Sequence, residues 1–117
     1  MSKRNDIDLL YDISEASRRI IYYTKETGYD NFITDIKTQD SVIRNIEIIG
    51  EAVKNLSEEL RLKHKSIQWK NIAGMRDRLM HGYFGVNMDI LWGVVVEDIP
   101  LLAQEVEHIL SLQTKNG

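Results

Sequence analysis

Residues 38–57 read TQDSVIRNIEIIGEAVKNLS, and this stretch decides the fold. Its apolar side chains recur at steps of four and three residues, which places them on one face of an α-helix. That face consists of Val42, Ile46, Ile49, Val53 and Leu56. A helix with one apolar face has to bury that face against other elements. The pattern therefore predicts a helix over about 38–57 that packs at the centre of a helical protein.

The same spacing continues outward in both directions along the chain. Upstream it predicts a helix over about 6–27, and downstream a helix over about 87–112 with Asn87 as its N-cap. A shorter apolar pattern predicts a helix over about 69–81, ended by Gly82 and Gly85. Residues 29–36 are expected to form a short turn or a single helical turn, and residues 57–65 to close the preceding helix, with or without an extra turn, and lead into a basic loop. The predicted fold class is all-α, an antiparallel bundle of four main helices plus short helical turns.

Three residues inside the long predicted helices are unusual there. Gly50 and Gly93 lower helix propensity, and we interpret them as points where another backbone comes close, either within the bundle or across a dimer interface. Pro100 cannot donate a hydrogen bond to the carbonyl of Val96. Because the apolar period continues in phase across it, we expect a kink rather than a break.

Composition and length restrict the class of protein. The 117 residues fit one domain over residues 1–117, and the absence of cysteine excludes disulfides and thiolate chemistry. The longest uninterrupted apolar run has four residues, Ile20–Tyr23, whereas a membrane span needs about 18. The charged N-terminus gives no sign of export, so we expect a cytoplasmic protein. A net charge of −3 argues against a protein that coats nucleic acid.

The charge is unevenly distributed along the chain. Residues 44–81 hold eight basic and five acidic side chains, whereas residues 82–117 hold one basic and five acidic ones. A basic middle segment is compatible with a protein that engages a short stretch of RNA phosphate at a cleft.

The segment 71–86, NIAGMRDRLMHGYFGV, concentrates the residues that could carry chemistry. Arginine is a permanent phosphate ligand, and histidine moves protons near neutral pH. Asp77 and His81 are neighbours on a continuous helix, but Arg76 and His81 would lie about 140° apart around it. These two converge only if the helix unwinds near Gly82 or if a second chain completes the site. The alternative interpretation is an ordinary helix end, with solvated arginines and a capping histidine.

Arg76-Asp77-Arg78-Leu79-Met80-His81-Gly82-Tyr83 resembles the R-x4-H-x-Y motif of the HEPN superfamily, specifically its HepT-like toxins from prokaryotic toxin–antitoxin pairs. The resemblance covers nearly the whole chain. It includes the flanking blocks 48–53, 69–75 and 98–100.

This resemblance implies a metal-independent ribonuclease that needs no cofactor and works as a homodimer, with the motifs of both chains meeting at the interface. It implies Arg76 and His81 as catalytic residues and Asp77 as a supporting residue, although Asn is common at that position in the family. It also implies a minimal nucleotidyltransferase antitoxin that adds AMP to Tyr83 (AMPylation). An alternative is a non-catalytic helical module that docks this nucleotidyltransferase; another is a dimerising bundle without activity.

Other candidates receive weaker interpretations. His64 lies in a basic loop that steers phosphate weakly at most, and His108 is expected at the surface. The three histidines match no zinc-ligand spacing. Glu51 is a possible buried partner for Arg76. Trp69 and Trp92 are expected in the core or at a dimer interface.

Overall fold

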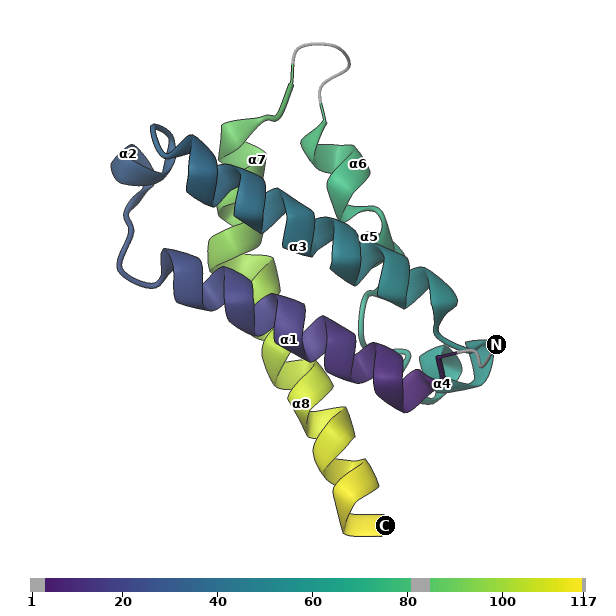
Figure 1. Cartoon of the computed structure of the whole chain (residues 1–117). Helices are drawn as coiled ribbons and strands as arrows, with labels where there is room; N and C mark the ends of the chain where they lie inside the picture. Colours follow the sequence, from purple (N-terminus) through teal and green to yellow (C-terminus); the bar gives the residue numbers. More distant parts are fainter. Residues whose placement is uncertain (1–3, 81–84, 117) are drawn as a thin grey trace.

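A computed structural model describes residues 4–80 and 85–116, with side chains up to Gln113. Two long helices, α1 (Asp6–Thr24) and α3 (Ile36–Asn55), lie side by side and antiparallel (Figure 1). Their bounds lie within three residues of the predicted ones, so both predictions are confirmed. The Asn5 side chain accepts a hydrogen bond from the backbone of Asp8 and starts α1.

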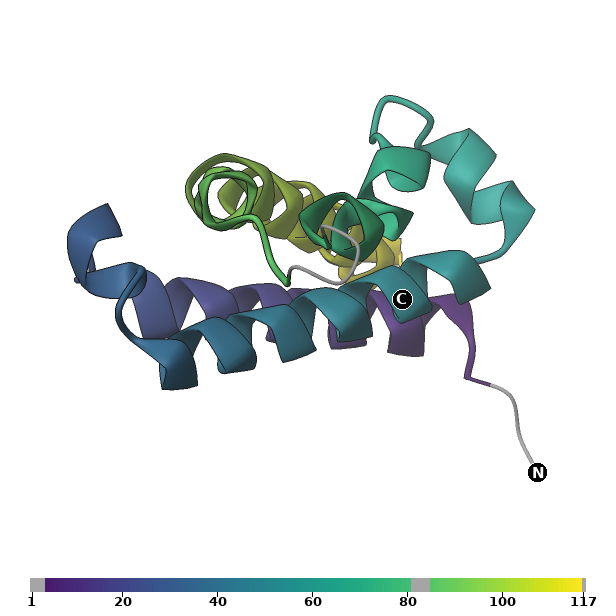
Figure 2. The same ribbon diagram turned by 90° about the horizontal axis from the view of Figure 1, so that it is seen from above.

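A second layer crosses one face of this pair obliquely (Figure 2). It contains α7 (Met88–Gly93), the π-helical turn η2 (Val94–Asp98) and α8 (Ile99–Asn116), which follow one another without interruption. Asn87 caps α7 as predicted, accepting from the backbone N–H of Ile90 at 3.0 Å. The π-helical turn lies directly before Pro100, so the helix is distorted there but not broken, as the in-phase apolar pattern indicated.

In the described chain, four short helices lie in the connections: the first joins α1 to α3, and the other three lie between α3 and the second layer. They are α2 (Tyr29–Phe32), α4 (Glu58–Lys63), α5 (Trp69–Ala73) and α6 (Met75–Leu79). The prediction of one helix over 69–81 was wrong, because the helix is divided at Gly74 and ends at Leu79. Glycine has low helix propensity. At the C-terminal end of α6, the Leu79 carbonyl accepts a hydrogen bond from the N–H of Asn87 at 2.8 Å, which is a contact to a later segment of the chain and not a bond within a helix.

The core lies between the layers and draws on every apolar face that the spacing predicted. Ile46 and Ile49 of α3 are fully buried, as are Ile13 and Ile20 of α1. Val95, Ile99, Leu102, Val106 and Ile109 are buried along η2 and α8. Burying each such side chain stabilises the fold by about 1.5–3 kcal/mol. Within the described residues no strand occurs beyond an isolated antiparallel bridge, so the all-α class is confirmed.

The two helix-interior glycines differ. A Cβ placed on Gly50 would lie 3.4 Å from the carbonyl oxygen of Ala73, which confirms the close approach and assigns it to the α3–α5 contact within this chain. A Cβ on Gly93 would meet no atom of the described chain within 4 Å.

Helices of the described residues are all too short or too polar to cross a membrane.

Candidate active site

The short helix α6 presents the arginine of the motif to solvent. Met75 and Leu79 are spaced four residues apart, share one face of α6 and are buried in the core. The residues between them, Arg76, Asp77 and Arg78, are therefore exposed. Met75 and Leu79 therefore hold α6 against the core, and the charged residues of α6 lie on the outer surface.

Arg76 is held by a carboxylate of α3. Its Nε donates to Oε2 of Glu47 at 2.9 Å, and both side chains are about half exposed. Only the Nε takes part in this hydrogen bond, so the terminal nitrogens of the guanidinium can contact a further ligand. The suggestion that Glu51 is the buried partner of Arg76 was wrong. Glu51 is exposed and lies one helical turn further along α3, where its backbone carbonyl accepts the Asn55 side chain.

The neighbouring arginine has a different environment. Arg78 lies 3.8 Å from a carboxylate oxygen of Asp98 in η2, and its guanidinium also reaches the Asn71 carbonyl at 3.5 Å. The first contact joins α6 to η2 of the second layer, and the second joins it to α5. Arg78 therefore faces η2 and α5, whereas Arg76 projects towards α3.

The described residues before and after the rest of the motif contact one another. Met80 and Val86 form an antiparallel bridge, and Asn87 donates its N–H to Leu79. His81 and Tyr83 lie outside the described residues. Because α6 ends at Leu79 and Met80 is extended, the ideal-helix argument that set His81 about 140° from Arg76 and beside Asp77 does not apply to this chain.

The other candidates are placed as follows. Burial lowers the pKa of the His64 side chain, and nearby Lys63 lowers it further, so His64 adds little positive charge to its loop at neutral pH. His108 is exposed, as expected. Trp69 is buried, and the Trp92 ring lies 5.0 Å from that of Phe32, so both tryptophans pack in or against the core. Within the described part of the chain, no three His, Asp or Glu side chains group as they would around a metal ion.

Two contacts at this site were not found from the sequence. They are the ion pair of Glu47 with Arg76 and the hydrogen bond from the Asn87 N–H to the Leu79 carbonyl. Glu47 and Glu51 are four residues apart on one face of α3, so helical spacing could not distinguish them as partners of Arg76. Asn87 was recognisable as an N-cap, but its bond to Leu79 depends on how the chain returns after the motif. Both contacts are set by packing between distant segments.

Comparisons with known proteins give concordant results. The model of a family described as "Ribonuclease HepT-like" matches residues 13–109. A Thermococcus cleftensis protein named "Probable ribonuclease HepT" is 46% identical over 107 residues, covering 92% of this chain and 97% of its own. A Methanocaldococcus jannaschii protein named "Putative RNase MJ0127" is 44% identical over 110 residues, covering 94% of this chain and 91% of its own. No solved structure gives a significant match.

Proposed function

The chain belongs to the HepT-like ribonuclease family of the HEPN superfamily and is a ribonuclease, and we propose that it cleaves RNA with Arg76 and His81 at the interface of a homodimer. The observation that carries this proposal is the placement of Arg76. Its guanidinium is exposed on a core-anchored helix, and Glu47 engages only its Nε. An arginine held in this way is suited to bind an RNA phosphate through its terminal nitrogens.

The proposed reaction uses the RNA's own 2′-hydroxyl as nucleophile. That oxygen forms a bond to the adjacent phosphorus, and the bond from phosphorus to the 5′-oxygen of the next nucleotide breaks. A base removes the proton of the 2′-hydroxyl, and an acid gives a proton to the leaving oxygen. His81 suits either role, since histidine titrates near neutral pH. Arg76 stabilises the negative charge that develops on the phosphate oxygens.

The need for a base and an acid explains why a homodimer is part of the proposal. The motif supplies one histidine per chain, and a two-fold interface brings two copies of the same surface together. The His81 side chains of the two protomers would then act as base and acid. Asp77, exposed on α6 next to Arg76 in the chain, is proposed to support the site. The proposal requires no metal ion or cofactor.

Cleavage assays with a chelator present test this mechanism. We expect the wild-type protein to cleave single-stranded RNA in EDTA, and His81→Ala to lose about 10²–10⁴-fold in rate. Arg76→Ala should lose activity as well. Arg18→Ala, which removes an exposed arginine of α1 paired with Glu15, is the matched control and should cleave normally. Cleavage by His81→Ala at the wild-type rate would refute the mechanism, and a monomer in light scattering at assay concentration would refute the shared site.

Regulation by a nucleotidyltransferase antitoxin is the second part of the proposal. AMP on Tyr83 would add bulk and negative charge close in sequence to the residues that bind RNA phosphate. Incubation with the partner enzyme and ATP should increase the intact mass by one AMP group in the wild type and not in Tyr83→Phe. A protein that accepts AMP and binds the partner, but cleaves no RNA in any condition, would instead be the non-catalytic docking module.

A further inference from the structure

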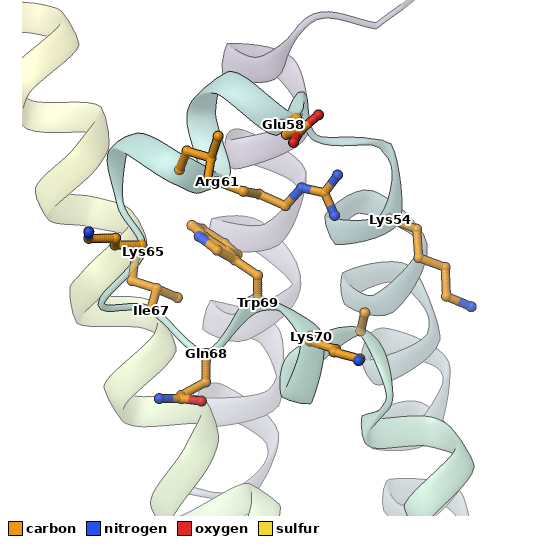
Figure 3. A pocket seen from close by; sticks show the side chains of 10 residues that line it. Lys54, Glu58, Arg61, Lys65, Ile67, Gln68, Trp69 and Lys70 are labelled. Atoms are coloured by element: carbon orange, nitrogen blue, oxygen red, sulfur yellow. The ribbon is translucent and has the colours of Figure 1, made fainter.

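A basic pocket lies where α3, α4 and α5 meet, outside the motif (Figure 3). We use the name for the cavity bordered by Lys54, Arg61, Lys65 and Lys70, with Trp69 at its base. Its volume is about 680 Å³, within the range of about 300–1,000 Å³ typical of small-ligand sites. Three separate helical segments supply its walls, so the tertiary fold assembles it.

Positive charge dominates the border of the basic pocket. Among the residues that the structure describes, four cations line it and Glu58 is the one acidic lining residue. Across the described residues, none of the four cations lies within 4.0 Å of a carboxylate oxygen. The Nε of Arg61 is also buried without a hydrogen-bond partner among those residues. Four cations with no carboxylate of the described chain within ion-pair distance leave the border of the basic pocket with positive charge that is not neutralised, which favours an anionic ligand.

The base of the basic pocket is apolar and rigid. The Trp69 indole is 6% exposed and its Nε1 donates to the His64 carbonyl at 3.1 Å, which fixes the orientation of the ring. Ile67 is buried beside it, and Leu62 offers an exposed apolar side chain at the edge. Figure 3 shows Trp69 in the middle, with Arg61, Lys65 and Lys70 around it. A ligand that matches both features carries phosphate next to a flat, weakly polar group, as a nucleotide does.

The basic pocket and Arg76 lie along the same face of α3. Glu47 holds Arg76, Gly50 contacts the Ala73 carbonyl, and Lys54 borders the basic pocket. These three α3 residues are spaced by three and four positions, so they share one face. Seven residues of helix rise by about 10 Å. Because α5 packs on α3 at Gly50, between Arg76 and the basic pocket, a short single strand of RNA whose phosphate meets Arg76 would reach the basic pocket by passing over the outer side of α5.

We propose that the basic pocket binds the backbone of single-stranded RNA and holds the strand beside Arg76, with phosphate at Arg61 and Lys70 and the nucleoside against Leu62 and Trp69. This proposal rests on the proposed function, because it takes the ligand to be the RNA that Arg76 and His81 cleave. It adds a binding site that the R-x4-H motif does not contain.

Binding is measured in a His81→Ala background, so that no cleavage interferes. The probe is a short fluorescein-labelled uridine oligonucleotide, and fluorescence anisotropy is followed over a series of salt concentrations. The test variant is Arg61→Gln/Lys70→Gln. The matched control is Lys25→Gln/Lys37→Gln, which removes two exposed positive charges far along the chain from the basic pocket. Circular dichroism confirms that both variants retain the parent's helical content.

The test variant should bind the oligonucleotide about tenfold more weakly than the parent. Its slope of log affinity against log salt should fall by about 1.4, from about 0.7 for each lost phosphate contact of a single strand. The control should stay within about twofold of the parent. Equal affinities of the test and control variants would overturn the proposal.

Two further measurements separate RNA from other anions. Leu62→Ser changes an exposed side chain, so folding should persist; it should weaken binding of the oligonucleotide and leave binding of a poly-glutamate peptide unchanged. Equal weakening of both would indicate a general anion site and overturn the proposal. Loss of uridine monophosphate binding in Arg61→Gln/Lys70→Gln, with oligonucleotide binding intact, would overturn it in favour of a free nucleotide. Failure of His81→Ala to reduce cleavage would refute the proposed mechanism and leave these binding results standing.

Discussion

Substituting the two helix-interior glycines with valine tests the packing of α5 on α3, which positions Arg76. Gly50 and Gly93 both have negative φ, and each lies in a helical segment. A Cβ at Gly50 would lie 3.4 Å from the Ala73 carbonyl oxygen, whereas a Cβ at Gly93 would meet nothing of the described chain within 4 Å. The same substitution therefore meets a backbone at one position and open space at the other.

The expected magnitudes follow from helix propensity and overpacking. Valine is a slightly better helix former than glycine, so Gly93→Val should stabilise the protein by a few tenths of a kcal/mol, about 0.3. At Gly50 the same gain is outweighed, because the γ-methyl groups extend beyond a Cβ that already touches Ala73. Valine adopts one main rotamer in a helix and cannot turn away. Gly50→Val should therefore destabilise by about 1–3 kcal/mol.

Urea unfolding of both variants, followed by circular dichroism, measures this difference. Gly50→Val should also lower RNA cleavage, since displacing α5 shifts the start of α6 and with it Arg76. The alanine variants are informative controls, because alanine adds no atom beyond Cβ: Gly93→Ala should gain about 0.8–1 kcal/mol and Gly50→Ala less. Equal stabilities of Gly50→Val and Gly93→Val would refute the reasoning.

Three more outcomes are expected from individual contacts. Hydrogen bonding to Arg18 lowers the pKa of Glu15 from 4.5 to about 2, so the stability it contributes is present above pH 4.5 and is lost as the pH falls towards 2. The urea midpoints of wild type and Glu15→Gln should therefore differ most at neutral pH and converge in acid; a constant difference would contradict this. The Ser57 hydroxyl caps α4, so Ser57→Ala should cost about 1 kcal/mol in urea unfolding, and an unchanged midpoint would be inconsistent with that role. Glu47→Gln breaks a half-exposed ion pair, so stability should change by less than about 1 kcal/mol. Its kcat for RNA should fall up to about fivefold with no rise in KM, because Arg76 loses its orientation; an unchanged kcat would show that Glu47 does not orient it.

Much of the fold could be predicted because helix formation is encoded locally. The four-and-three spacing of Val42, Ile46 and Ile49 depends only on neighbours in the chain, and it predicted α3 within two residues at each end. The same holds for the N-cap at Asn87. The helix over 69–81 was predicted too long because its apolar pattern continues past Gly74, while the break and the end at Leu79 depend on packing against other segments.

For the site, the sequence by itself determined which residue types stand in the R-x4-H-x-Y motif and which family the chain belongs to. Only the tertiary structure decided that Arg76 is paired with Glu47 rather than Glu51, and that Leu79 is bonded to Asn87. It also brought Lys54, Arg61 and Lys70 from three helices around one cavity. The physical reason is that such contacts join residues far apart in the chain. They depend on the angle and register at which helices pack, which the local spacing of apolar side chains does not specify.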